Sequence, residues 1–529
     1  MSLFPLEGKK GDQKLFKHLK AVDSFGFLSD ATKALLAALS LHDNEDFWTI
    51  QKDLAPLWKQ ILTDALRTLK TYDARECDPP GSDKYDSFFD QHSLGVEELQ
   101  RALIESFKQF EGLLYGAMPE GYRDHVVHSI RVWILGQHIL KDYLKGTLQS
   151  DRGFQIRPVE WECMWAIAAL CHDVGYPLEA LEKINTAAST TFQKFGLRPV
   201  SPLRFEFSPQ MLPFHDAMIK LMSANPIRLP INSERKERGR NQFVAHVQHK
   251  YYLKFSKSFD SLDHGVVSSL LVARSLVYFL ESDFTRDHFR PLDAEDARQM
   301  LIRREILRSM ASHTCPDIYH LHFNTLSFLL FITDELQYWG RPTLEQMRQG
   351  GSDKSDSGKV SLHGFDRRAV KYEFTVRNTV WEKQKDNFWK KLTVVRRMLR
   401  LAVGTKVLLH NEFEVKYCVP RQVGVALNLK DGKLTWQVLK RGKEEWVPFA
   451  STSGLSPWED KAETKRKADE RKAEAKKKAV AKAAGAKRRA KAATTSVPAP
   501  GPARTKKVAP RSTSAPGKVV SVVSVKKAP

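Results

Sequence analysis

Residues 158–177, PVEWECMWAIAALCHDVGYP, are the stretch that decides the fold. The apolar run from Pro158 to Leu170 predicts a buried helix. Gly175 and Pro177 then make continuation of that helix unfavourable. The pair His172–Asp173 therefore lies where a buried helix ends, and two neighbouring side chains there can both reach one metal ion.

Three further stretches place histidine or aspartate beside apolar residues on expected helices. They are GYRDHVVHSIRVWILG at 121–136, LDHGVVSSLL at 262–271, and SMASHTCP at 309–316 followed by LLFITDELQYWGRP at 329–342. Apolar surroundings raise the cost of an unpartnered polar group, and one metal ion can partner several such groups together. Imidazole and carboxylate ligands suit Zn, Mn, Fe or Mg, so ligand type alone does not select the metal.

The order H…HD…H…H…D resembles the HD superfamily of metal-dependent phosphohydrolases, over about residues 121–342. HSIRV resembles the first-helix motif of that family, CHDVG its His-Asp doublet, and FITDEL its last-helix motif. The resemblance implies a helical-bundle core and a first metal site. The implied ligands of that site are His128, His172, Asp173 and Asp334.

His264 and His313 resemble the histidines that bind a second metal in the binuclear branch, which contains cyclic-nucleotide and cyclic-dinucleotide phosphodiesterases. The resemblance thus implies two divalent ions (Mn, Mg, Fe, Co, Ni or Zn). It also implies hydrolysis of a phosphoester of a nucleotide or related small molecule by metal-activated water. Asp173, as a bridging ligand, and His264 are the expected catalytic residues, together with Arg341 as a phosphate holder. The GYP after the doublet is not the separate motif of the HD-GYP branch.

Several other residues near these motifs have alternative interpretations. Arg341 could hold phosphate or pair with Glu335, whereas Arg123 and Lys183 are weaker candidates that we favour as solvated surface charges. His125 lies three residues before His128, on the same helical face. It could replace a ligand or support one, and we favour a structural role. Asp263 could orient His264 or cap the helix that follows.

Composition and periodicity predict a mainly α protein that ends in a small α+β domain and a basic tail. We expect a helical N-terminal region at 1–120, an HD-type domain at 121–349 with an irregular insertion at 185–262, a flexible linker at 350–364, an α+β domain at 365–457 and a disordered tail at 458–529. Within the α+β domain, VKYEFTV, EVKYCV, VGVALNL and LTWQVLK alternate as strands do. Asp431-Gly432 predicts a hairpin between the last two.

The net charge of +22 is concentrated in the tail, since residues 461–529 hold 21 Lys and Arg against 4 Asp and Glu. Such a tail could bind nucleic acid or another polyanion without sequence specificity. The sequence has no apolar run of membrane-spanning length. Its five cysteines are scattered, which favours reduced thiols and a cytoplasmic location. The oligomeric state stays open.

Two other functions share this ligand set. One is a di-iron oxygenase of the HD type, which redox-active iron and uptake of O₂ would distinguish from a hydrolase. The other is a catalytically silent protein that senses a nucleotide and associates with nucleic acid through the tail. Retention of all six ligand-type residues favours the hydrolase.

Overall fold

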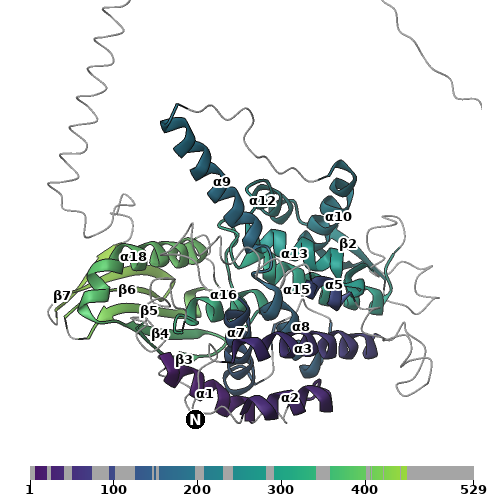
Figure 1. Ribbon diagram of the computed structural model, residues 1–529, viewed down its shortest axis with the longest axis horizontal. Coiled ribbons are helices and arrows are strands. Elements are labelled where there is room, and N and C mark those ends of the chain that lie inside the picture. The colour runs from purple at the N-terminus through teal and green to yellow at the C-terminus, as the bar shows by residue number, and fades with distance from the viewer. Residues whose placement is uncertain are drawn as a thin grey trace, which may run out of the picture. The chain divides into compact units, whose positions relative to one another are not determined.

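In the computed structural model, a helical core is followed along the chain by a six-stranded sheet (Figure 1). The chain divides into two units, Met1–Gly454 and Leu455–Pro529. The structure describes residues of the first unit only, and the expected tail lies outside them. The described residues are 6, 8–20, 25–40, 50–73, 95–101, 125–145, 148–149, 154–196, 208–229, 242–280, 291–340, 358–400, 406, 408–420, 422–440 and 443–448.

Helix α8 lies at the centre of the helical core. The elements up to this point are α1 (Gly8–Lys20), α2 (Asp30–Ser40), α3 (Gln51–Thr71), α5 (Val96–Gln100), α7 (His125–His138), the π-helix η4 (Ile139–Tyr143) and α8 (Pro158–Cys171). Helix α8 packs against α3, α7 and α15, and almost all of its residues are buried. Trp165 donates a hydrogen bond to the carbonyl of Trp133 in α7 at 2.9 Å. A Cβ on Gly136 would meet that indole at 1.9 Å, so the close helix contact requires glycine.

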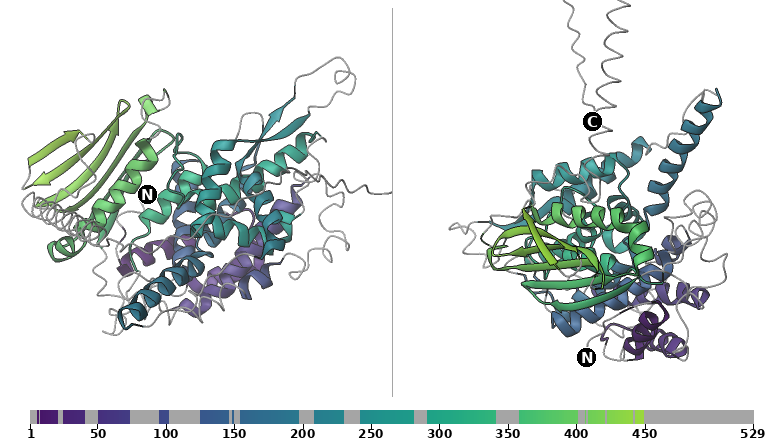
Figure 2. Two further views of the ribbon diagram at one scale, coloured as in Figure 1. Left: turned by 90° about the horizontal axis from the view of Figure 1, so that it is seen from above. Right: turned by 90° about the vertical axis from the view of Figure 1, so that its left-hand side faces the viewer.

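The region expected to be an irregular insertion is largely regular where it is described. It contains α9 (Tyr176–Lys194), the 3₁₀-helix η5 (Pro209–Met211), α10 (Leu212–Ser223), β1 (Ala224–Arg228), β2 (Phe243–Val247) and α12 (His249–Asp260). Strands β1 and β2 pair antiparallel, and α9 extends away from the core (Figures 1 and 2). Where the region is described, the prediction of irregular structure was wrong, because two of its prolines, Pro209 and Pro213, lie at helix starts.

Further helices of the core follow α12 along the chain. They are α13 (His264–Ser275), α14 (Val277–Leu280), α15 (Ala294–Ser312) and α16 (Leu326–Leu336). Helix α15 packs against α8, α13 and α16. Helix α16 begins at Leu326. There Thr325 caps it, because its hydroxyl accepts a hydrogen bond from the backbone N–H of Phe328 at 3.2 Å.

The sheet has the order β3-β4-β5-β6-β7-β8. Its strands are β3 (Lys359–Phe365), β4 (Ala369–Thr375), β5 (Glu412–Val419), β6 (Val423–Lys430), β7 (Lys433–Lys440) and β8 (Lys443–Pro448). Strands β4 and β5 are parallel, and α18 (Asn378–Arg400) connects them and packs on the sheet (Figures 1 and 2). The short 3₁₀-helix η8 (Leu408–His410) precedes β5.

The predicted linker 350–364 is wrong at its C-terminal end, because 359–364 belong to β3. Val360, Leu362 and Phe365 are buried there and the strand pairs with β4. Residues 350–357 lie outside the described residues. The hairpin between β6 and β7 is confirmed, since Asp431 and Gly432 have φ of 50° and 69° between paired Lys430 and Lys433.

The predicted mainly helical fold with a smaller α+β part is thus confirmed, while an HD-type bundle stays a prediction. No helix among the described residues is long and apolar enough to cross a membrane.

Buried His320 provides a test of the packing beside α16. Its ring is 6% exposed and stacks near Phe331, with ring centroids 6.0 Å apart. Burial lowers its pKa to about 4, so the unfolded chain binds the proton more tightly. Stability should fall as the pH drops from about 6.5 towards 4, with a loss of about 2 kcal/mol between pH 7 and pH 5 from this group. Urea unfolding at pH 7 and pH 5 measures the loss in both proteins, and we expect a smaller loss in His320→Gln than in the unsubstituted protein. An equal loss in both proteins would contradict the assignment.

Candidate metal centre

Six side chains of the expected ligand set come together at the ends of five helices. His128 lies in the first turn of α7, and His172 caps the C-terminus of α8, with Asp173 next to it. His264 begins α13, and His313 caps the C-terminus of α15. Asp334 lies in the last turn of α16. Segments that are far apart in sequence therefore meet because α8 and α15 pack against each other and against their neighbours.

The carboxylate of Asp173 faces two pairs of histidines with its two oxygens. Its Oδ2 lies 3.7 Å from His128 Nε2 and 3.3 Å from His172 Nε2. Its Oδ1 lies 3.4 Å from His264 Nε2 and 3.7 Å from His313 Nε2. Each oxygen is thus directed at a different pair of imidazole nitrogens, which is the arrangement expected of a carboxylate shared by two ligand groups.

Asp334 completes the group on the Oδ2 side. Its Oδ1 lies 2.9 Å from His128 Nε2 and 3.9 Å from His172 Nε2. Ligand atoms of these three residues all lie within 4.8 Å of one another. The same limit holds for a second group, His172, Asp173 and His313. The structure therefore contains clusters of histidine and aspartate that could hold a metal ion.

The far nitrogen of each histidine is anchored. Nδ1 of His172 donates to the carbonyl of Ala169 at 2.8 Å, and Nδ1 of His313 donates to that of Met310 at 2.6 Å. Nδ1 of His128 is 2.5 Å from Gln337 Oε1, and Nδ1 of His264 is 2.5 Å from Glu179 Oε2. Oxygen acceptors on Nδ1 leave the lone pair of a neutral ring on Nε2, aimed at the centre.

Two of these Nε2 atoms lack a hydrogen-bond partner. Those of His172 and His313 are buried and make no hydrogen bond to the described part of the chain. A buried polar atom left without a partner costs about 1–3 kcal/mol. Metal ions bound at the centre would accept these two lone pairs, so the residues present fit such a group.

Both aspartates are ionised at neutral pH. Burial raises the pKa of Asp173, but the surrounding histidines lower it well below its usual range. Burial likewise opposes ionisation of Asp334, and His128 overcomes it, so this pKa is also lowered. Burial alone would lower the pKa of His264, but Asp173 and Glu179 outweigh burial and raise this pKa to about 10, so a metal ion that binds Nε2 of His264 would displace a proton. The centre therefore offers two anionic ligands among its imidazoles.

His125 and Asp263 lie next to the proposed ligands. His125 lies 3.9 Å from Asp173 Oδ2, and its ring packs 4.4 Å from that of Tyr176, measured between centroids. It borders the centre without joining either group of ligand atoms. Asp263 caps α13, because its Oδ1 accepts from Gly265 N at 3.1 Å and from the Thr314 hydroxyl. Helix capping is thus the role that the structure gives Asp263.

The candidate phosphate holders fall outside what the structure describes. Arg123 and Arg341 are not among the described residues, and the side chain of Lys183 is not described either. Glu335, the suggested salt-bridge partner of Arg341, pairs with Lys391 of α18 at 2.9 Å. A phosphate contact by Arg341 stays a proposal.

Sequence reasoning missed the two residues that orient the histidines. Gln337 lies three residues after Asp334. This spacing is typical of two side chains on the same face of a helix, and it was the available signal for Gln337. Glu179 lies in the first turn of α9 and also accepts from the backbone N–H of His264 at 3.1 Å. Nothing in the local sequence links Glu179 to His264, because 85 residues separate them.

Gly175 sets the distance between the doublet and α13. A Cβ at Gly175 would lie 2.6 Å from the carbonyl oxygen of His264 and 2.7 Å from the backbone nitrogen of Ser268. Gly175→Ala should therefore displace α13 and with it His264. We expect a loss of about 1–3 kcal/mol in unfolding free energy and weaker binding of one metal ion, measured by denaturant unfolding and by metal titration. Gly364→Ala is the control, since its Cβ would meet no atom within 4 Å; equal behaviour of the two variants would refute the prediction.

Comparison of the chain with protein families, with curated proteins and with solved structures found no match.

Proposed function

We propose that this protein is a binuclear, metal-dependent phosphohydrolase of the HD type. The observation that carries the proposal is the division of the ligand groups by the two oxygens of Asp173. One ion would be held by His128, His172, Asp173 and Asp334. The other would be held by Asp173, His264 and His313.

A bound pair of divalent ions would supply Lewis acidity and lower the pKa of a water molecule towards neutrality. The protein's own residues would supply charge to the two ions and hold their imidazole ligands in place. Asp173 and Asp334 contribute negative charge, and the anchored Nδ1 atoms keep the rings from turning. Glu179 holds the Nδ1 proton of His264 on the far side of that ring. No nucleophilic Ser or Cys is needed, because water is the nucleophile.

Substrate would approach from the side of Asp334. The side chains of His128 and His172 are 0% exposed, while that of Asp334 is 32% exposed and that of Glu179 21% exposed. A centre that is exposed at one edge and otherwise buried suits a small phosphoester, such as a nucleotide, more than a folded macromolecule. The phosphoryl group would enter beside Asp334 and His264.

The test is a panel of nucleoside mono-, di- and triphosphates, cyclic mononucleotides and cyclic dinucleotides. Full-length protein is stripped with chelator and reloaded with Mn, Mg, Fe, Co or Ni. We expect hydrolysis with at least one metal and none from His172→Ala/Asp173→Ala, which serves as the blank. Hydrolysis that persists in the blank would refute the assignment. Iron loading with O₂ uptake and no hydrolysis would identify an oxygenase, and metal binding without either reaction would identify a binding protein.

A further inference from the structure

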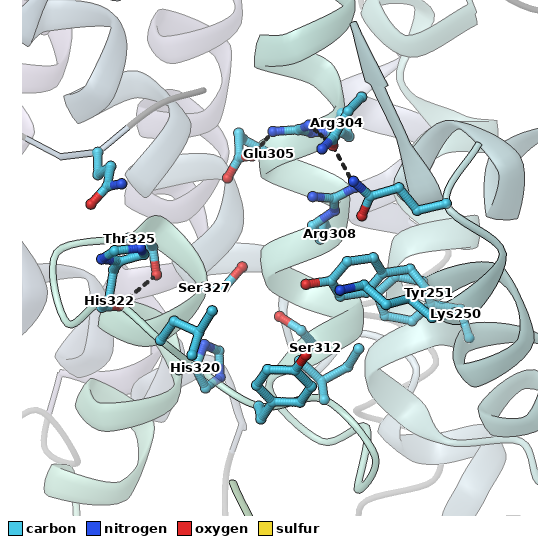
Figure 3. Close-up of a pocket in the computed structure, with 17 residues that line it drawn as sticks. Lys250, Tyr251, Arg304, Glu305, Arg308, Ser312, His320, His322, Thr325 and Ser327 are labelled. Carbon is cyan, nitrogen blue, oxygen red and sulfur yellow. Dashed lines mark hydrogen bonds and ion pairs between the residues drawn. The ribbon is translucent and has the colours of Figure 1, made fainter. Parts of the chain in front are cut away.

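A cavity lies beside α15. Its volume is about 320 Å³, and none of the six proposed metal ligands is among the described residues that line it. Its walls come from α12, α15, the start of α16 and the segment 318–322. Figure 3 shows Arg308 and Tyr251 on one side, opposite His322 and Thr325. The volume is at the lower end of the range for pockets that hold small molecules.

The cavity carries a net positive charge. Arg304, Arg308 and Lys250 line it, against a single acidic residue, Glu305. The two arginines are four residues apart and share one face of α15. Arg304 is 1% exposed and pairs with the adjacent Glu305, so the net positive charge of the lining comes from Arg308 and Lys250. An anion is therefore the kind of ligand that this wall attracts.

The arginines are also held in place before any ligand binds. Arg308 donates from Nε to the carbonyl of Met222 at 2.6 Å and from Nη2 to that of Ala224 at 3.1 Å. Arg304 donates from Nη1 to the same Ala224 carbonyl at 3.2 Å. The Arg308 guanidinium lies 5.0 Å from the centre of the Tyr251 ring. Cations fixed in this way lose little further freedom when an anion binds.

Two buried polar atoms of the lining provide independent support for a ligand. His320 Nε2 and Gln149 Oε1 are buried and make no hydrogen bond to the described part of the protein. The oxygen of Gln149 can only accept, so it requires a donor. His320 is neutral at pH 7, because burial lowers its pKa to about 4. A ligand with hydroxyl groups would satisfy both atoms, which an inorganic anion with no donor would not.

We propose that this cavity is a second ligand site, which binds a phosphorylated sugar. The phosphate group would face Arg304 and Arg308, and the sugar hydroxyls would reach Gln149 and His320. Phosphorylated sugars and nucleoside monophosphates share this chemistry.

Calorimetric titration of full-length His172→Ala/Asp173→Ala in chelator tests the proposal without the metal centre. The probes are ribose 5-phosphate, adenosine monophosphate, ribose and inorganic phosphate. We expect saturable binding of ribose 5-phosphate, weaker binding of inorganic phosphate and none of ribose. If adenosine monophosphate binds at least as tightly as ribose 5-phosphate, the cavity is a nucleotide site. If adenosine monophosphate does not bind and ribose 5-phosphate does, the cavity is a sugar-phosphate site. This outcome is independent of hydrolysis, so it can hold even if the proposed function fails.

Variants locate the binding. In the same background, Arg308→Gln should lower the affinity for ribose 5-phosphate by about tenfold or more, because it removes a charge-assisted contact. Lys257→Gln is the matched control, since Lys257 lies on α12 and pairs with Asp317 outside the lining. Gln149→Leu leaves every charge in place. It should lower the affinity for ribose 5-phosphate but not the affinity for inorganic phosphate. Unchanged affinity in Arg308→Gln and Gln149→Leu, or equal losses in Lys257→Gln, would overturn the proposal.

Discussion

Asp173→Ala is expected to leave the protein without either metal ion and without hydrolysis above the blank. The reason is geometric: both ligand groups use this one carboxylate, through Oδ2 on one side and Oδ1 on the other. Asp334→Ala and His264→Ala, by contrast, should each affect one group. The metal content of desalted, manganese-loaded protein measures the difference.

The comparison also needs a carboxylate whose loss should not matter. Asp142 is 55% exposed and pairs with His138 at 2.8 Å, at the end of the helical segment that carries His128. Asp142→Ala should therefore retain both ions. If Asp173→Ala keeps one ion while Asp334→Ala or His264→Ala loses both, the shared role belongs to another residue and the two-group arrangement is wrong.

The proposed ligand residues could be identified as candidates in the sequence because their signals are local. His128 and Asp334 lie within apolar helices and His172 and Asp173 at the end of one, and an ionisable group in such surroundings requires a partner. Their order along the chain then suggested the HD type. The structure adds that the five segments meet, which depends on how α8 packs against α15 and could not follow from helix periodicity.

What sequence reasoning missed depends on contacts between distant segments. Arg304 and Arg308 lie in IRREILR, which has the charge pattern of a solvated helix face, yet Arg304 is buried against β1. Gln149 joins the same cavity from a separate segment. Strand β3 was missed for a similar reason, since the alternation of Val360 and Leu362 is short and follows a run of Gly, Ser and Asp. Only pairing with β4 makes it a strand.

The other large expected effect concerns the buried ion pair between α1 and α7. Arg131 donates from Nε to Asp12 Oδ1 at 2.8 Å and from Nη2 to Oδ2 at 2.6 Å. Its Nη1 donates to the carbonyl of Gly340 at 2.6 Å, and the indole of Trp339 donates to Asp12 Oδ1 at 3.0 Å. Both charged residues are 1% exposed. The pair thus joins the N-terminal helix to α7, which carries His128, and to the segment after α16.

Asp12→Ala should lower the unfolding free energy by about 3–5 kcal/mol, because it leaves the guanidinium of Arg131 buried without its counter-charge. Denaturant unfolding measures the loss. Asp30→Ala in α2 is the control: Asp30 is fully exposed and lies 3.8 Å from Lys33, and solvent screens such a pair so that its loss changes stability little. Asp12→Leu/Arg131→Met should recover most of the stability, since apolar residues can replace a buried pair. A double variant no more stable than Asp12→Ala would show that the hydrogen bonds to Gly340 and Trp339, and not the unpaired charge, dominate the effect.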